Sequence, residues 1–356
     1  MVSNVSTHAQ NELLRRRVLE IQTEVNRVQV QVSSGKKSDA YSGLGEGARL
    51  SLNLRTTRAT TTAFIDGNVV TRTRMDQMQN VLGRVKDIAA EVRNATLFAM
   101  SSAALPAQTG SSALKAQAQS AIKEIIQLLN TELDGFHLFA GRETDAAPMT
   151  SPGEIGSAGT PLDNVAQVTA VSPLGAAAAS GDTVYDNIVL HLDGTAVGPE
   201  AGASPARYYT GEFNATDESL IVARIDNDFD LDYGVTGRND GFNDVLQALY
   251  ALATSDLSPA TDAGYRRLAT RAAADLATGF DEIVTEIGAL GVKQAQLRDL
   301  TIRQQDFITT LDLQIGDVED IDMADAISRL TFTQSNLEAS FRMIASMREL
   351  SLARLL

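Results

Sequence analysis

The chain has 356 residues, with no cysteine, no tryptophan and a formal net charge of -15 at pH 7. The lack of cysteine excludes disulfide bonds, thiol nucleophiles and thiolate metal sites, and the acidic balance argues against binding to the phosphate backbone of nucleic acids. No apolar run approaches the roughly 20 residues that span a bilayer, and no N-terminal segment has the pattern of a cleaved signal peptide. We therefore expect neither a nucleic-acid nor a membrane partner.

The N-terminal part of the chain carries apolar residues whose spacing alternates strictly between four and three positions. They are Leu14, Val18, Ile21, Val25, Val28 and Val32. This heptad spacing predicts a helix with the narrow apolar stripe of a coiled coil, too narrow for a helix that buries a broad face in a globular core. Gly35 is expected to end the helix.

Two more helices are expected before residue 142. The first covers about residues 48–104 and keeps heptad spacing from Met75 to Val92. Pro106 and Gly110 are expected to separate it from the second, whose apolar residues from Leu114 to Leu128 share one face. The first 142 residues therefore form a predicted N-terminal helical arm.

The middle of the chain, residues 143–245, differs in composition from both flanks. It holds 17 acidic and three basic residues, a balance of -14, and six of the eight prolines. Short runs rich in β-branched residues at 165–171, 183–192 and 220–233 predict strands between turns. We expect an acidic, β-rich middle domain that faces water.

Four aspartates alternate with other residues in the last of these runs: Asp226, Asp228, Asp230 and Asp232. On a single strand they would share one face, where four carboxylates could gather a Ca²⁺ ion. The spacing fails the rule for an EF-hand loop, because that loop needs glycine where Leu231 stands and a carboxylate where Gly237 stands. A solvated strand face is the favoured interpretation.

The C-terminal part, residues 246–356, returns to helical patterns. Heptad spacing from Leu276 to Val318 predicts a helix over about residues 261–318, roughly 85 Å long at 1.5 Å per residue. A last helix is expected from about Asp322. Its stripe consists of Ile327, Leu330, Leu337, Phe341 and Ile344.

Together these patterns predict a mainly α fold with a β-rich insert. Long antiparallel, coiled-coil-like helices from both termini would carry the central β domain, with boundaries at residues 1–142, 143–245 and 246–356. Periodicity alone leaves open whether the partner of each terminal helix lies in the same chain or in another copy.

The sequence contains no complete motif for catalysis or for binding a cofactor. Gly35-Lys36-Lys37-Ser38 resembles a phosphate-binding loop, but Val30 stands where that motif requires glycine. His8, His137 and His191 lie in separate segments with no metal-ligand spacing. We expect no catalytic, cofactor-binding or metal-binding residues, and therefore no enzyme.

Several segments resemble the flagellin superfamily. The stretch Leu14–Lys37 is similar to that family's N-terminal helix, which ends in a Ser-Gly-Lys turn. The stretch Asp320–Ile327, together with the sequence that continues to Leu352, is similar to its C-terminal signature. Flagellin and hook-associated protein 3 share both features.

A third segment distinguishes between these two families. In Leu129–Gly141, an Asn-Thr pair is followed by an aromatic-Leu-Phe-Ala-Gly sequence, which resembles hook-associated protein 3. Tyr208–Glu212 and Gly241–Leu246 also resemble parts of that family's middle domain. The similarity covers both flanks well and the insert loosely.

The resemblance implies a structural subunit of the bacterial flagellum at the junction of hook and filament, exported by the flagellar type III apparatus. Its implied partners are copies of itself, hook-associated protein 1, flagellin and an export chaperone. The implied assembly interface consists of the two terminal stripes given above. Two alternatives stay open: a flagellin of short α-proteobacterial type, and an acidic surface adhesin or ligand-binding protein that uses the insert.

Overall fold

The computed structural model describes residues 2–101, 107–171, 174, 177–192, 220–255 and 262–352. Internal packing divides the chain into two compact units. Unit 1 consists of Met1–Ala63 and Ile302–Leu356, and unit 2 consists of Phe64–Thr301. Helices dominate both units, so the predicted mainly α fold is confirmed.

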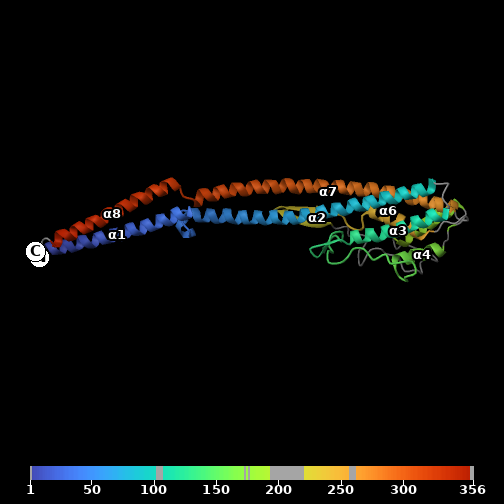
Figure 1. The fold of residues 1–356 in the computed structure, drawn as a ribbon, viewed down its shortest axis with the longest axis horizontal. Coiled ribbons are helices and arrows are strands. Elements are labelled where there is room, and N and C mark those ends of the chain that lie inside the picture. Colours follow the sequence, from blue (N-terminus) through green and yellow to red (C-terminus); the bar gives the residue numbers. More distant parts are fainter. Residues whose placement is uncertain are drawn as a thin grey trace. The chain divides into compact units, whose positions relative to one another are not determined.

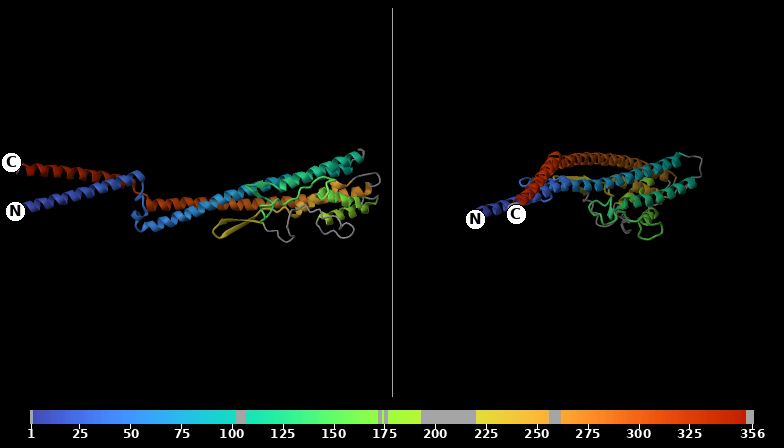
Figure 2. Two further views of the ribbon diagram at one scale, coloured as in Figure 1. Left: turned by 90° about the horizontal axis from the view of Figure 1, so that it is seen from below. Right: turned by 60° about the vertical axis from the view of Figure 1, so that its left-hand side comes forward.

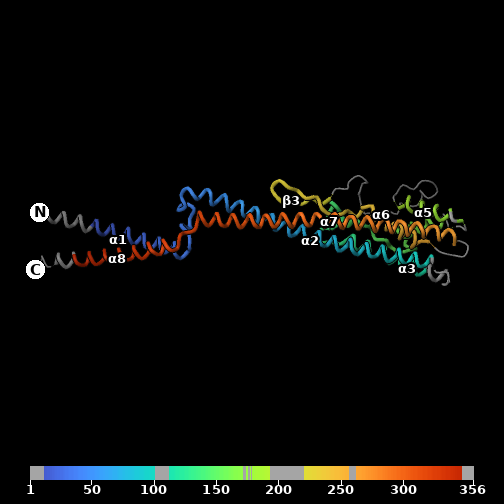
Figure 3. The backbone as a smooth tube through the Cα atoms, turned by 90° about the horizontal axis from the view of Figure 1, so that it is seen from above, coloured from blue at the N-terminus to red at the C-terminus, as the bar shows by residue number. Residues whose placement is uncertain are grey.

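Unit 1 is built from the two terminal helices and from the ends of two longer ones. It contains α1 (Val2–Ser34), the short 3₁₀ turn η1 (Tyr41–Leu44) and the beginning of α2 (Gly47–Ser101). The end of α7 (Asp262–Glu319) and all of α8 (Met323–Leu352) complete it. Helices α1 and α8 lie side by side and antiparallel (Figures 1 and 3). Within the chain, each predicted terminal helix therefore has the other as its partner.

Unit 2 is built around its central helix α6 (Asp240–Thr254). The residues of α6 from Val245 onward are almost all buried. Asn239 caps this helix, because its side chain accepts a hydrogen bond from the Gly241 amide. Helix α6 packs on α3 (Ala107–Leu129) and on two shorter helices, α4 (Pro161–Val171) and α5 (Ala178–Leu192). Heptad residues of α2 and α7, which are largely buried as predicted, supply much of the remaining core, and the segments around Phe139 and Tyr233 add to it.

The segment Leu129–Gly141 forms a structural corner in unit 2. Strands β1 (Glu132–Leu133) and β2 (Phe136–His137) form a hairpin, and positive φ angles at Asp134 (54°) and Gly135 (83°) close its two-residue turn. The Asn130 side chain both donates to and accepts from the Met149 backbone at 2.8 Å. These contacts fix the path of the chain where α3 ends.

The end of the same segment enters the core. Phe139 is fully buried and packs edge to face on Phe242 of α6, with ring centroids 6.1 Å apart. Its carbonyl accepts a hydrogen bond from the Gly237 amide at 2.8 Å. The aromatic-Leu-Phe-Ala-Gly sequence thus anchors the corner to α6.

Two of the predicted strands are helices. Residues 165–171 belong to α4 and residues 183–192 to α5, so these two strand assignments are wrong. The buried aliphatic residues recur every three or four positions, at Leu162, Val165 and Val168 in α4 and at Val184, Ile188 and Leu192 in α5. Helical spacing of apolar residues therefore outweighed the strand preference of β-branched residues. The start of α3 also differs, because Gly110 lies inside this helix rather than before it.

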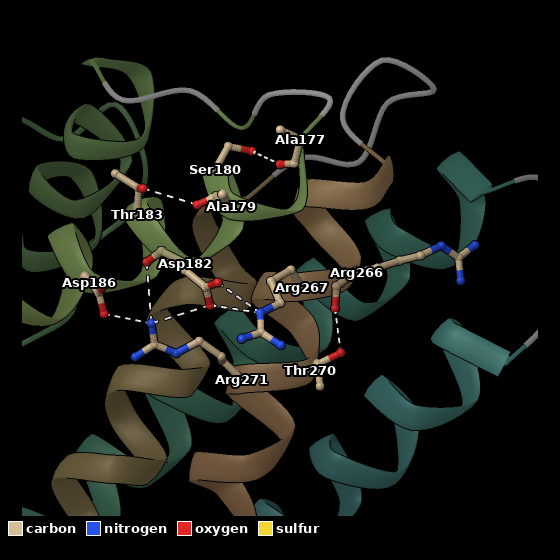
Figure 4. Close-up of polar contacts among 10 residues, drawn as sticks. All are labelled: Ala177, Ala179, Ser180, Asp182, Thr183, Asp186, Arg266, Arg267, Thr270 and Arg271. Atoms are coloured by element: carbon tan, nitrogen blue, oxygen red, sulfur yellow. Dashed lines mark hydrogen bonds and ion pairs between the residues drawn. The ribbon is translucent and has the colours of Figure 1, made fainter.

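Helix α5 docks on α7 at close range. A Cβ atom on Gly181 would lie 2.1 Å from the Gly264 carbonyl oxygen, so no larger residue fits without a shift. Around this contact, Arg267 pairs with Asp182 at 3.0 Å and Arg271 with Asp186 at 2.7 Å (Figure 4). These pairs are partly exposed and add little stability, but they fix the register of the two helices.

The third predicted strand region is a hairpin, drawn in yellow in Figure 2. Strands β3 (Ile221–Asp226) and β4 (Phe229–Tyr233) pair antiparallel, and their inward residues Ile225, Leu231 and Tyr233 are buried. The prediction that four aspartates share one strand face is wrong. Only Asp230 and Asp232 share a face of β4, because Asp226 ends β3 and Asp228 lies in the turn.

The predicted boundaries of the middle domain, residues 143–245, rest on composition, and they stay a prediction. The stretch Tyr208–Glu212, which contributes to the family resemblance, lies outside the described residues.

Candidate assembly surface on the terminal helices

The six apolar residues predicted on α1 form its contact with α8, which we call the seam. Val18, Val25 and Val28 are buried, and Leu14, Ile21 and Val32 are half-buried. The heptad stripe on α1 is therefore confirmed as one packed face. Since these residues pack within the chain, a role in contacts between subunits stays a prediction for them.

The five residues predicted on α8 separate into two groups. Leu330, Leu337 and Ile344 are half-buried at the seam, where the buried Ala326 and the small residues Thr333 and Ser340 supply the alternate heptad positions. In contrast, Ile327 and Phe341 remain 49% and 47% exposed. The structure thus does not bring all five to one buried stripe.

More apolar side chains of α8 face solvent on its other side. Phe332 is 69% exposed, and it is rotated about 140° around the helix from Ile327, since each residue advances about 100°. Met343 lies three turns further on the same side as Phe332 and is also exposed. A helix that carries apolar residues around most of its circumference is normally buried on more than one side. Helix α1 covers only one side of α8.

Helix α1 repeats this arrangement to a smaller extent. Leu19 is 62% exposed, and Val30, eleven residues further along, is exposed on the same side, away from the seam. Single exposed apolar residues are ordinary on protein surfaces, but sets aligned along a helix indicate a surface that another protein covers. We call the exposed residues of this kind the outer apolar surface. It comprises Leu13, Leu19, Val30, Ile327, Phe332, Phe341 and Met343.

A buried carboxylate lies at the base of the seam, where α7 ends. The Glu319 side chain is only 6% exposed and accepts hydrogen bonds from Ser51 Oγ at 2.6 Å and from Arg55 Nε and Nη2 at 2.7 and 2.6 Å. Lys36 Nζ lies 3.1 Å from the same carboxylate. We call Lys36, Ser51, Arg55 and Glu319 the Glu319 cluster. It brings together the segment after α1, the first turns of α2 and the last residue of α7.

The hydrogen bond from Arg55, supplemented by those from Ser51 and Lys36, holds the pKa of Glu319 well below its usual value, although burial acts in the opposite direction. The carboxylate therefore stays ionised at any physiological pH. Sequence reasoning missed this cluster, because its four residues are separated by up to 283 positions and belong to no motif.

The Gly35-Lys36-Lys37 sequence is part of the same structure. Gly35, with φ of 71°, ends α1, and its amide still donates to the Gln31 carbonyl. Lys36 contacts Glu319, and Lys37 Nζ donates to the carbonyls of Asp317 and Val318 at 2.8 Å. Both lysines are thus engaged at the end of α7.

The described parts of the chain show no group of three histidine or carboxylate side chains that could hold a metal ion. Among the described residues, no helix has a stretch long and apolar enough to cross a membrane.

Comparison with known proteins supports the architecture. A solved structure described as a flagellar hook-associated protein from Vibrio parahaemolyticus superposes with a TM-score of 0.52. The match covers 79% of this chain and 99% of the other, at 14% sequence identity. This chain has the fold of a flagellar hook-associated protein. At this identity the match concerns the fold alone, and at that level the resemblance to the flagellar family is confirmed.

A second solved structure, FlgL from Bacillus cereus, matches with a TM-score of 0.49 and 12% identity, covering 74% of this chain and 99% of that one. The sequence matches no family model and no curated protein.

Proposed function

We propose that this chain is a structural subunit of the bacterial flagellum that assembles with other subunits through α1 and α8. The observation that carries the proposal is the outer apolar surface, which α1 and α8 leave uncovered when they pair. The shared fold with a protein described as flagellar and hook-associated supports it. The role is structural rather than catalytic, and it places the chain outside the cell after export by the flagellar type III apparatus.

The mechanism is burial of apolar area. Each Å² of apolar surface removed from water contributes about 25 cal/mol, so neighbouring subunits that cover the outer apolar surface would stabilise a tube of packed terminal helices. In this proposal, the eleven predicted interface residues have two different roles. Those at the seam hold α1 to α8, whereas Ile327 and Phe341 contact neighbours.

Within the flagellum, we propose the position between hook and filament. The segment Leu129–Gly141, which resembles the hook-associated protein 3 family rather than flagellin, supports this position. The partners would be further copies of the chain, hook-associated protein 1 on the hook side, flagellin on the filament side and an export chaperone before assembly.

An assembly assay tests whether the chain assembles through α1 and α8. Purified chain is concentrated stepwise, and the fraction that pellets on ultracentrifugation is measured alone and with hook-associated protein 1. The double variant Ile327→Ser with Phe341→Ser should require a higher concentration to pellet. Val284→Ser with Val292→Ser is the matched control, because these residues of α7 are similarly exposed but lie in unit 2. Equal behaviour of the two double variants would refute the role of α8.

Immunogold labelling of isolated flagella tests the proposed position of the chain between hook and filament. An antibody raised against this chain should label a band at the distal end of the hook. Labelling along the whole filament would instead identify the chain as flagellin.

A further inference from the structure

The link between α7 and α8 is short and held at several points. Only three residues, Asp320 to Asp322, separate the two helices. The Lys37 amide donates to the Glu319 carbonyl at 2.7 Å, and the Ile321 amide donates to the Gly35 carbonyl at 3.0 Å. These two bonds join the link to the segment after α1 as a small antiparallel bridge.

The link continues directly into the cap of α8. Asp322 Oδ1 accepts from the amides of Ala324 and Asp325 at 2.9 and 3.2 Å. These bonds satisfy two of the free amides of the first turn and fix the point where α8 begins. Glu319, the last residue of α7, stands directly before this link.

We propose that Glu319 is a positioning residue for assembly, which fixes the direction in which α8 leaves α7 and hence the direction in which the outer apolar surface faces. This inference rests on the proposed function. Unlike Ile327 or Phe341, Glu319 contacts no neighbour in this role and acts through the helix that follows it.

The seam cannot supply this constraint by itself. On its α8 side, the small residues Ala326, Thr333 and Ser340 alternate with Leu330, Leu337 and Ile344, so every other heptad position offers little side chain to interdigitate with the valines of α1. The pair of terminal helices can thus stay together while turning as a body about the link. Rotation of the pair is opposed at its base, where the Glu319 cluster joins the segment after α1 and the start of α2 to the carboxylate at the end of α7.

The contacts of the Glu319 cluster depend on the negative charge of its carboxylate. One carboxylate bonds two cations and a hydroxyl, and Ser51 is itself fully buried. Glutamine at position 319 would keep the size of the side chain but lose the charge-assisted hydrogen bonds, which are about twice as strong as neutral ones. Its amide group would also face the guanidinium of Arg55 with a donor. Glu319→Gln should therefore loosen the link without removing any apolar packing.

The chain offers a matched control in the same unit. Arg58 and Asp312 form a second ion pair between α2 and α7, with Nε and Oδ1 2.5 Å apart, and both side chains are nearly half exposed. Asp312→Asn removes the same charge from the same helix, but from an exposed pair that contributes little.

The test measures a distance within unit 1 of the monomer. Because the chain has no cysteine, spin labels on Thr310→Cys in α7 and Ser335→Cys in α8 report one distance only. Both positions are exposed. The parent and Asp312→Asn should give one narrow distance peak, and Glu319→Gln should lose it. Arg55→Lys, which keeps the charge but not the two-pronged contact, should broaden the peak to an intermediate extent.

The same variants are then compared in the pelleting assay. Glu319→Gln should raise the concentration needed for assembly by about tenfold or more, in line with the loss of one partner of a buried charged pair. Circular dichroism should show unchanged helix content. A narrow peak in Glu319→Gln would overturn the inference, as would a broadened peak with unchanged assembly. If the parent chain never assembles, the proposed function fails, and the distance measurement alone decides whether Glu319 fixes the link.

Discussion

Tyr185 of α5 donates its phenolic hydrogen to Oδ2 of Asp275 in α7 across 2.5 Å. Burial, together with the nearby Asp275 carboxylate, raises the pKa of this phenol well above its usual value, so it remains a donor at all working pH values. The Arg271 guanidinium lies over the Tyr185 ring, 4.6 Å from its centroid. Because its donor is buried, this hydrogen bond is a stronger polar contact between α5 and α7 than the partly exposed ion pairs of Figure 4.

Removing the hydroxyl should therefore be costly. We expect Tyr185→Phe to lower the free energy of unfolding of unit 2 by about 1–3 kcal/mol, because the Asp275 carboxylate loses a buried donor. Urea unfolding followed by circular dichroism measures the change. Tyr41→Phe is the control, since Tyr41 is half exposed and should change stability by less than about 0.5 kcal/mol. Equal effects at the two positions would contradict this account.

Two glycines of α7 should respond in opposite directions to the same substitution. A Cβ atom on Gly279 would lie 2.6 Å from the Gly241 carbonyl oxygen and 2.7 Å from Val245 Cγ2, whereas Gly288 has open space around it. Gly279→Ala should destabilise unit 2 by about 1–3 kcal/mol through forced separation of α6 and α7. Gly288→Ala should stabilise it by about 0.5–1 kcal/mol, because alanine favours helix. Thermal unfolding of the two variants side by side measures both effects, and a stabilising Gly279→Ala would show that α6 and α7 do not pack closely here.

The stability of unit 2 should depend on pH through Asp244. Burial, followed by the carboxylates of Glu282, Asp275 and Asp240, raises the pKa of Asp244 from 3.8 to about 6. The folded chain therefore binds this proton more tightly than the unfolded chain. The resulting stabilisation is complete below about pH 4 and is lost as the pH rises through about 6.

Asp244→Asn should remove this dependence. At pH 8 the variant should be more stable than the parent chain by about 1–2 kcal/mol, less than the whole pKa shift corresponds to, because solvent screens this half-buried group. At pH 4 the difference should nearly vanish, because the protonated aspartic acid is then as neutral as asparagine. Urea unfolding between pH 4 and 8 measures the two curves. Asp281→Asn, at an exposed position of α7, should follow the parent chain throughout.

Sequence reasoning succeeded where one periodicity dominated a long stretch. Heptad spacing from Met75 to Val92 and from Leu276 to Val318 predicted helices whose stripes are packed in the structure. It failed in α4 and α5, where β-branched content favoured strands although the apolar residues also had helical spacing. In segments of 11 and 15 residues, the two signals compete, and in both segments the spacing was the better guide.

The candidate site was only partly predictable, for a different reason. The seam residues of α1 follow from their spacing, but the register of α8 does not, because Ile327 and Phe341 fit the same heptad pattern as Leu330 and Leu337. Their exposure depends on how α8 is rotated against α1, and that rotation depends on small residues such as Ser340 and on long-range contacts such as those of Glu319. A linear pattern contains neither.

The two groups of α8 residues lead to a last prediction, in which one substitution affects the seam and the other the outer apolar surface. Leu337 is half-buried against α1, so Leu337→Ala should weaken the pairing of the terminal helices by about 1–2 kcal/mol, less than a fully buried leucine would. Phe341 is exposed, so Phe341→Ala should leave the pairing within about 0.5 kcal/mol of the parent chain.

Hydrogen exchange on dilute monomer separates the two effects, because amides between Val18 and Val32 report the pairing of α1 with α8. These amides should exchange faster in Leu337→Ala and at the parent rate in Phe341→Ala, whereas the pelleting assay should detect a defect in Phe341→Ala. Faster exchange in Phe341→Ala would mean that this ring belongs to the seam. If Phe341→Ala assembled at the same concentration as the parent chain, Phe341 would not contact a neighbouring subunit. The apolar residues of α8 that α1 leaves uncovered would then no longer be explained by assembly.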